Sequence, residues 1–259
     1  MKINPSQTVG QIAVNLKESI PVFEKYKINY YNQGSRSLKD ACYLAGVPLE
    51  GVSLELEALV PSPGEWYLEE KDWRNEPMGE VADHIVKTHH PYVRKQLDRI
   101  EKILEDLVRP SLSPVPEIPL VRSFFMDMSR DLRIHLRQEE EVVFPYLVEA
   151  EIAMERGAPL PSTFKGYNAI THPIRMLQDD HGMMGNEWMK IEELTNGFTA
   201  PDDASPLLKE LYQAFRELEK DNRKHMHLEN NILFHRAMQL GLFNNGEKNE
   251  NLYEKTPHL

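Results

Sequence analysis

The amino-acid sequence predicts an all-α protein: an antiparallel four-helix bundle preceded by a small helical N-terminal domain. From Met78 onward, four long segments repeat apolar residues at i, i+3 and i+4 spacing, which is the period of an amphipathic helix. The gaps between these segments are polar or rich in proline, and such connections favour antiparallel neighbours. The sequence shows no β-strand pattern longer than a few residues.

Changes in composition predict the domain boundaries. Residues 1–60 contain short helical patterns and are expected to form the small N-terminal domain. Residues 61–77 hold three prolines and a glycine, which indicates a linker that packs partly through Trp66, Tyr67 and Trp73. Residues 78–245 are assigned to the bundle, and residues 246–259 to a polar tail.

Composition excludes several classes of function. The formal net charge of −11 argues against binding of nucleic acid or of an anionic membrane surface, both of which need clustered Lys and Arg. No segment approaches the roughly 18 apolar residues of a membrane span, and no apolar leader is visible. The single cysteine, Cys42, cannot form an internal disulfide. A cytoplasmic protein, monomeric or homodimeric, is therefore expected.

Each long segment carries one histidine on its apolar stripe. In the first segment His90 lies between Val86 and Val93, whereas at about 100° per residue His89 and His84 point away. Two segments add a glutamate one helical turn after the histidine, on the same face. The six inward polar residues are His90, His135, Glu139, His181, His225 and Glu229.

The order of these residues is an internal repeat. It reads His, then His-x3-Glu, then His, then His-x3-Glu, and the two histidines of each half are 45 and 44 residues apart. The local sequence repeats as well, because HLRQEEEVVF from His135 matches HMHLENNILF from His225. We therefore expect a pseudo-two-fold bundle in which each half supplies two histidines and one glutamate.

This set of side chains is suited to two metal ions. Imidazole and carboxylate ligands without thiolate favour iron or manganese over structural zinc. Two glutamates can each bridge two ions, which leaves room for an oxo or hydroxo bridge and a small exogenous ligand. A single buried histidine is more often a hydrogen-bonded core residue than a ligand. Six buried polar residues in a repeated order are hard to explain without metal, since buried charges are costly unless paired.

The remaining polar candidates are expected to have lesser roles. Asp180 is either an orienting carboxylate for a ligand or a solvated residue, and Glu140 and Glu141 are expected on a solvated face. The other histidines either support the ligands from outside or lie at the surface, and the surface is the favoured expectation; they are His84, His89, His172, His227 and His235.

The motifs resemble hemerythrin-like di-iron proteins of the RIC type (Repair of Iron Centers), which carry an N-terminal ScdA-like domain. The four segments HHPYVRKQL, HLRQEEEVVFPYL, DDHGMMGNEW and HLENNILF resemble that family's ligand segments, and VFEKYKINYYNQGSRSL resembles its N-terminal domain. The resemblance implies two iron ions rather than manganese, held by the six residues, with Glu139 and Glu229 bridging. The family's N-terminal domain usually carries adjacent cysteines, where this chain has Tyr31 and Asn32.

The resemblance implies a role in nitrosative or oxidative stress, with three alternatives for the chemistry. The protein repairs damaged iron–sulfur clusters by donating labile iron, with iron–sulfur proteins as the acceptors. Alternatively, it reduces nitric oxide or peroxide at the two metals. The third alternative is a sensor that binds O2 or nitric oxide reversibly.

Overall fold

The structure is a computed structural model that describes residues 2–59, 71–108, 115–161 and 171–240. The first ten residues of the expected linker, with Trp66 and Tyr67, and the expected tail 246–259 lie outside these ranges. Trp73 lies within them, half-buried against the bundle, and its ring stacks on that of His84 at 4.4 Å between centroids. The expected packing of the linker is thus observed at this residue.

Four short helices form an N-terminal module. Side-chain caps begin two of them, because Thr8 accepts a hydrogen bond from the Gln11 amide and Ser37 from the Asp40 amide. Gly46 ends the third helix in the left-handed conformation, with φ of 67°. The apolar faces enclose a core of their own around Phe23 and Tyr30. The helices are α1 (Val9–Asn15), α2 (Ser19–Lys25), α3 (Leu38–Ala45) and α4 (Leu49–Ala58).

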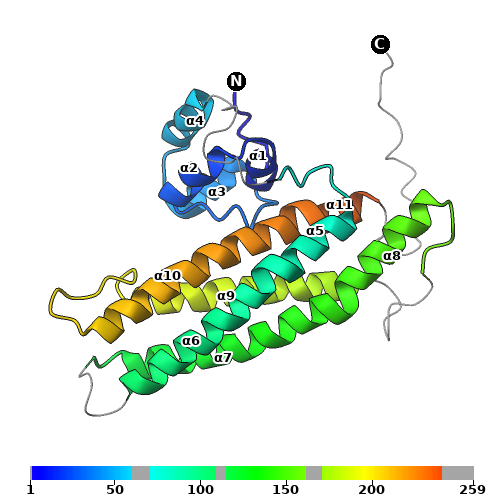
Figure 1. Ribbon diagram of the computed structural model, residues 1–259. Coiled ribbons are helices and arrows are strands. Elements are labelled where there is room, and N and C mark those ends of the chain that lie inside the picture. The colour runs from blue at the N-terminus through cyan, green and yellow to red at the C-terminus, as the bar shows by residue number, and fades with distance from the viewer. Residues whose placement is uncertain (1, 60–70, 109–114, 162–170, 241–259) are drawn as a thin grey trace.

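The rest of the described chain forms an antiparallel four-helix bundle, as expected (Figure 1). Successive rods run in opposite directions, α6 packs against α7 and α10, and α7 packs against α9. No strand occurs in the residues that the structure describes. The rods are α5–η1–α6 (Met78–His84, Ile85–His89, His90–Leu107), α7–η2–α8 (Ile118–Gln138, Glu139–Val143, Phe144–Glu155), α9 (Thr171–Leu194) and α10–η3–α11 (Pro206–His227, Leu228–Leu233, Phe234–Gln239).

Three of the four rods contain a π-helical turn, at the level where the polar residues point inward. The amides of His90, Phe144 and Phe234 each donate to the carbonyl five residues earlier instead of four. In two rods a proline follows directly, Pro91 or Pro145. A proline inside a helix has no amide hydrogen and clashes with the carbonyl four residues back, and a wider turn relieves that clash.

The π turns correct the predicted apolar stripes. The α-helical period predicts Val86, Val142 and Tyr146 inside, yet these three side chains are only half-buried. The neighbouring residues Ile85, Val143 and Leu147 are buried instead. A wider turn inserts an extra residue into the repeat, so the stripe beyond it continues one position away from its α-helical register.

Two apolar clusters fill the bundle and leave a polar layer between them. One cluster gathers side chains from α6, α7, α9 and α10, with Phe125, Trp188 and Phe215 in aromatic contact. The other gathers side chains from α5, α8, the start of α9, η3 and α11. Within the described residues, no helix combines the length and the low charge needed to cross a membrane.

Candidate metal centre

All six residues selected from the apolar stripes meet in the layer between the two clusters. Every one is buried, with at most 3% of its surface exposed. They come from all four rods: one from α6, two from the α7–η2 junction, one from α9 and two from α10 and η3. The six form two overlapping groups of four whose ligand atoms lie within 4.8 Å of one another, and both groups include Glu139 and Glu229.

Each glutamate places one carboxylate oxygen in each group. Glu139 Oε2 lies 3.4 Å from His90 Nε2, while its Oε1 lies 3.0 Å from His135 Nε2. Glu229 Oε1 lies 2.8 Å from His225 Nε2, while its Oε2 lies 3.2 Å from His181 Nε2. We call the two groups the His90–His225 position and the His135–His181 position. Both carboxylates span the two positions, as bridging ligands do.

The donor atoms fit a pair of cations. The four carboxylate oxygens are buried, and none has a hydrogen-bond partner of acceptable geometry in the described residues. The Nε2 atoms face each other at 3.3 Å in the His90–His225 position and at 3.0 Å in the His135–His181 position. Two atoms bound at right angles to one metal at about 2.1 Å would lie about 3 Å apart. Lone pairs this close, without donors, repel unless a cation lies between them.

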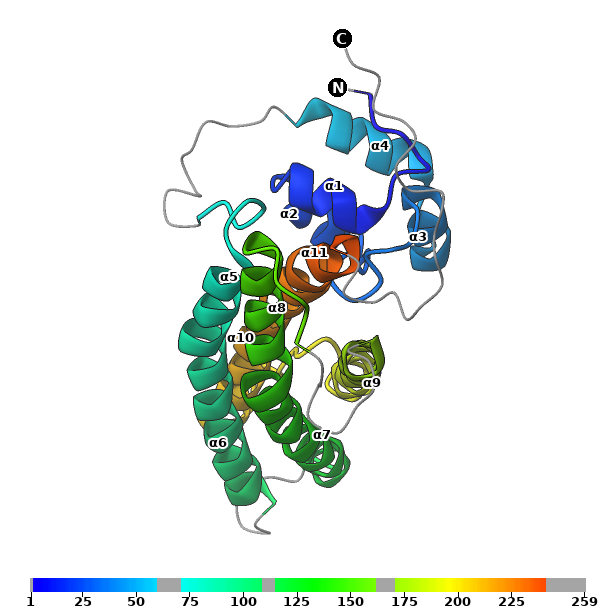
Figure 2. The ribbon, with the colours of Figure 1, turned by 90° about the vertical axis from the view of Figure 1, so that its right-hand side faces the viewer.

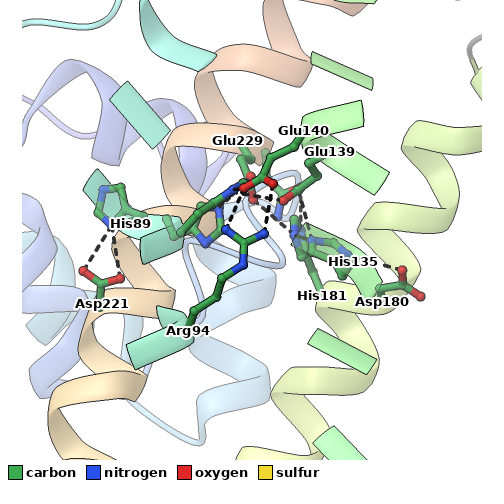
Figure 3. Close-up of polar contacts among 12 residues, drawn as sticks. His89, Arg94, His135, Glu139, Glu140, Asp180, His181, Asp221 and Glu229 are labelled. Atoms are coloured by element: carbon green, nitrogen blue, oxygen red, sulfur yellow. Dashed lines mark hydrogen bonds and ion pairs between the residues drawn. The ribbon is translucent and has the colours of Figure 1, made fainter. Parts of the chain in front are cut away.

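Hydrogen bonds at the far side of three imidazole rings set the tautomer (Figure 3). His90 Nδ1 lies 2.6 Å from Glu140 Oε1, and His135 Nδ1 lies 3.3 Å from Asp180 Oδ2. His181 Nδ1 lies 3.3 Å from Asn230 Oδ1. Because these oxygens accept, each Nδ1 carries the proton and leaves its Nε2 lone pair free for a metal.

Without metal, the same geometry favours a protonated histidine beside ionised glutamates. The pKa of His135 is raised to about 10, because the charges of Glu139 and Glu229 and the bond to Asp180 outweigh burial, which disfavours the charged ring. Glu139 lies among opposing influences. Burial and the charge of Glu229 act to raise its pKa, but the nearby histidines prevail and lower it. The pKa of Glu229 is likewise lowered, well below its ordinary value. A proton on His135 thus partly takes the place of a cation.

Two residues expected at the surface belong to the centre. Glu140 accepts from His90 and is held in turn by Arg94, whose two terminal nitrogens donate to its two oxygens at 2.8 and 2.9 Å. His89 is buried, bonds to Asp221 at 3.1 Å, and stacks parallel to the ring of His225. The π turns explain both errors, because they rotate Glu140 and His89 from the outer face that a regular α-helix predicts. Pro91 and Pro145, inside helical patterns, were the signal for such turns.

The other expectations are met unevenly. Asp180 contacts His135, which fits the orienting role rather than that of a solvated residue. Three other histidines, His84, His227 and His235, are half-buried and contact Trp73, Asn231 and Gln239 respectively. The side chain of His172 lies outside the described residues. No sequence pattern points to Asn230, because its role depends on the N-terminal module.

The N-terminal module lies over the α9 and α10 side of the bundle (Figure 2). A cavity of about 680 Å³ lies at this seam, between the loop 27–31 and the two helices. Gly185 and Arg223, which belong to its lining, are four residues after His181 and two residues before His225. The cavity therefore lies beside the centre, although none of the six inward residues lines it.

The fold and the buried His/Glu cluster define a helical-bundle protein of the hemerythrin type. Residues 81–237 match the family described as the hemerythrin HHE cation binding domain, and the chain belongs to this family. Residues 5–60 match the ScdA_N domain of unknown function. These matches confirm the resemblance drawn from the motifs.

Similar proteins share both parts of the chain. The iron-sulfur cluster repair protein YtfE of Citrobacter koseri is 28% identical over 234 residues, which cover 90% of this chain and 96% of that protein. Proteins of the same name from Escherichia coli and Shigella boydii are 29% identical over the same shares. The similarity therefore spans the N-terminal module as well as the bundle.

Proposed function

We propose that this chain is a non-haem di-iron protein that repairs iron–sulfur clusters damaged by nitrosative or oxidative stress, and that it does so by donating labile iron. The ligands are His90, His135, Glu139, His181, His225 and Glu229. One observation carries the proposal. Each of the two buried carboxylates directs one oxygen at one histidine pair and its other oxygen at the neighbouring pair. An oxo or hydroxo bridge would complete such a pair of ions.

Residues around the ligands keep them in the form that binds metal. Glu140 and Asp180 keep protons on the outer nitrogens of His90 and His135, so that the inner nitrogens stay available. The apolar clusters on both sides limit the access of water to the centre. Two iron ions bound there supply one-electron chemistry and a store of exchangeable iron.

Iron that leaves for an acceptor is the substrate of this activity, and its departure must not strand two buried charges. An uncompensated pair of carboxylates in the core would be costly. The raised pKa of His135 means that this imidazole takes up a proton when the site empties. Release of iron is therefore coupled to uptake of protons, which lowers the cost of the empty state.

The relatives support the assignment of cluster repair. The similar proteins from C. koseri, E. coli and S. boydii carry the name iron-sulfur cluster repair protein, and this chain matches nearly their full length. Iron–sulfur proteins are accordingly the proposed acceptors. The proposal for this chain rests on that likeness together with the arrangement of its own ligands.

Metal analysis and Mössbauer spectroscopy of protein purified without oxygen test the proposal. We expect two iron ions per chain and transfer of iron to an apo iron–sulfur protein in the presence of a competing chelator. Iron that stays bound through that incubation would contradict donation. Repeated turnover of nitric oxide or peroxide by the reduced protein would point instead to a reductase, and reversible binding of O2 or nitric oxide to a sensor.

A further inference from the structure

We infer that Asn230 and Asn32 are positioning residues for His181, through which the N-terminal module controls how tightly the His135–His181 position holds its ion. The inference rests on the proposed di-iron function and deepens it. It assigns to the module a role at one of the two metal positions, and it makes the release of one ion depend on whether the module is docked.

Two asparagines connect His181 to the module. Asn230 Oδ1 lies 3.3 Å from His181 Nδ1, while the Asn230 amide nitrogen donates to the Tyr31 carbonyl at 3.0 Å. From the module, the side chain of Asn32 donates to the His181 carbonyl at 3.0 Å. The loop itself is braced, because the Asn32 backbone amide donates to the side chain of Asn29. His181 is thus held at its ring and at its backbone by contacts that depend on docking.

The orientation of Asn230 matters because an amide has two unlike ends. The Tyr31 carbonyl can only accept, so it fixes the NH2 end of Asn230 toward the module and the oxygen toward His181. The oxygen keeps the proton on Nδ1 of His181 and leaves Nε2 bare. Once the module departs, the amide is free to rotate and present its NH2 end to Nδ1. That rotation favours the other tautomer, in which a proton on Nε2 blocks the metal-binding atom.

In the described part of the chain, the contacts that orient the His90–His225 position lie within the bundle. Glu140, which orients His90, is anchored by Arg94 of the same bundle. His225 is stacked on His89, which bonds to Asp221, again within the bundle. A charged carboxylate also keeps its acceptor character whichever way it turns, whereas an asparagine does not. Loss of docking should therefore speed iron release from the His135–His181 position and leave release from the His90–His225 position unchanged.

Docking can be disturbed without touching a ligand. The side chain of Asn231 donates to the Tyr30 carbonyl at 2.9 Å and lies against Gly34 and Gly10 of the module. A Cβ at Gly34 would fall 2.1 Å from Asn231 Oδ1 and 2.8 Å from the Tyr30 carbonyl, so an alanine there must displace the Asn231 side chain and disturb its docking bond to that carbonyl. On α9, a Cβ at Gly185 would lie 3.3 Å from the Asn32 side-chain nitrogen.

The chain offers matched controls for both changes. A Cβ at Gly51, on α4 of the same module, would meet only Pro48 at an ordinary 3.7 Å. A Cβ at Gly182, on α9 beside His181, would meet nothing within 4 Å. Matched pairs therefore separate loss of docking from the general effect of adding a methyl group. They are Gly34→Ala with Gly51→Ala, and Gly185→Ala with Gly182→Ala.

The test is the rate at which bathophenanthroline removes iron from the full-length, ferrous-loaded protein without oxygen. In Gly34→Ala and Asn230→Ala we expect one of the two iron equivalents to leave about 10-fold faster or more, the usual effect of losing an orienting residue, with the second unchanged. Gly185→Ala should show a smaller change of the same kind, and both controls none. Because both substitutions act on His181, Gly34→Ala combined with Asn230→Ala should accelerate release by less than the product of the two single effects.

Two results would overturn the inference. One is release unchanged in both Gly34→Ala and Asn230→Ala when circular dichroism shows a native helix content. The other is equal acceleration of both equivalents, which would mean that docking acts on the whole centre. A wild-type chain that binds no iron would instead refute the proposed function on which the inference rests. Should Gly34→Ala fail to fold, Gly185→Ala and Asn32→Ala decide the question.

Discussion

The two metal positions share both glutamates but differ in what supports their histidines. At the His90–His225 position the support is charged and lies within the bundle, since Arg94 grips Glu140 with two hydrogen bonds. At the His135–His181 position it consists of Asp180, which is 34% exposed, and the neutral amide of Asn230. Identical ligand sets thus have unequal anchoring, and the difference arises in residues that never touch the metal.

Removal of a shared carboxylate should have the largest effect, because it takes a ligand from both positions. We expect Glu139→Ala or Glu229→Ala to lose half or more of the iron, and the iron-loading increase in melting temperature to shrink or disappear. Elemental analysis and thermal denaturation with and without iron measure this. Glu141→Ala, an exposed neighbour in the same run, is the control. Full iron content in Glu139→Ala would rule out the bridging arrangement.

The metal-free and iron-loaded forms should respond to pH in opposite ways. The pKa of His135 is raised from 6.5 to about 10, so in the metal-free chain its stabilising contribution is complete below pH 6.5 and is lost as pH rises toward 10. The lowered pKa values of Glu139 and Glu229 add stability above about pH 4.5 that is lost on acidification. Metal-free protein should therefore be most stable between these limits.

Iron affinity should instead increase with pH, by up to about tenfold per pH unit for each proton displaced. Urea denaturation of both forms at pH 6, 8 and 9.5 checks the two trends. Because protons and iron compete for the same imidazoles, only the metal-free form should lose stability over this range. Parallel slopes for the two forms would show that the imidazoles are not the groups that exchange protons for metal.

Disruption of the charged support should weaken the His90–His225 position selectively. Glu140→Ala removes the acceptor that holds the proton on His90 Nδ1, and we expect a loss of iron affinity at one position of about 10- to 100-fold. Arg94→Ala should do the same to a lesser degree, since Glu140 remains. Competition with a chelator of known affinity gives the two constants separately. Equal behaviour of Glu140→Ala and Glu141→Ala would contradict the role of Glu140.

The smallest effect is expected at Asp180. Its contact with His135 is 3.3 Å long, compared with 2.6 Å for Glu140 and His90, and its side chain is partly exposed, so water can replace it. We expect Asp180→Asn to lower affinity at the His135–His181 position only a few-fold, by the same competition assay. A loss of iron affinity as large as that of Glu140→Ala would mean that the burial of an orienting carboxylate does not determine its effect on affinity.

The extent of sequence-based prediction differs between the six inward residues and their surroundings. The inward set could be found because a buried histidine or glutamate on an apolar stripe stands out, and because the order repeats in the two halves. A regular period of 3.6 residues misplaces Glu140 and His89, because that period does not hold across a π turn. Pro91 and Pro145 showed where the period would fail, but not by how much.

The all-α fold, the four rods and the identity of the inward polar residues can be read from the amino-acid sequence. Those features follow from spacing along one helix, which is a local property of the chain. The three-dimensional arrangement is needed to see which outer groups orient the histidines and how the N-terminal module reaches His181. Asn32 and His181 are 149 residues apart, and their hydrogen bond exists only when the module docks. Such contacts depend on packing between distant segments, which no local pattern encodes.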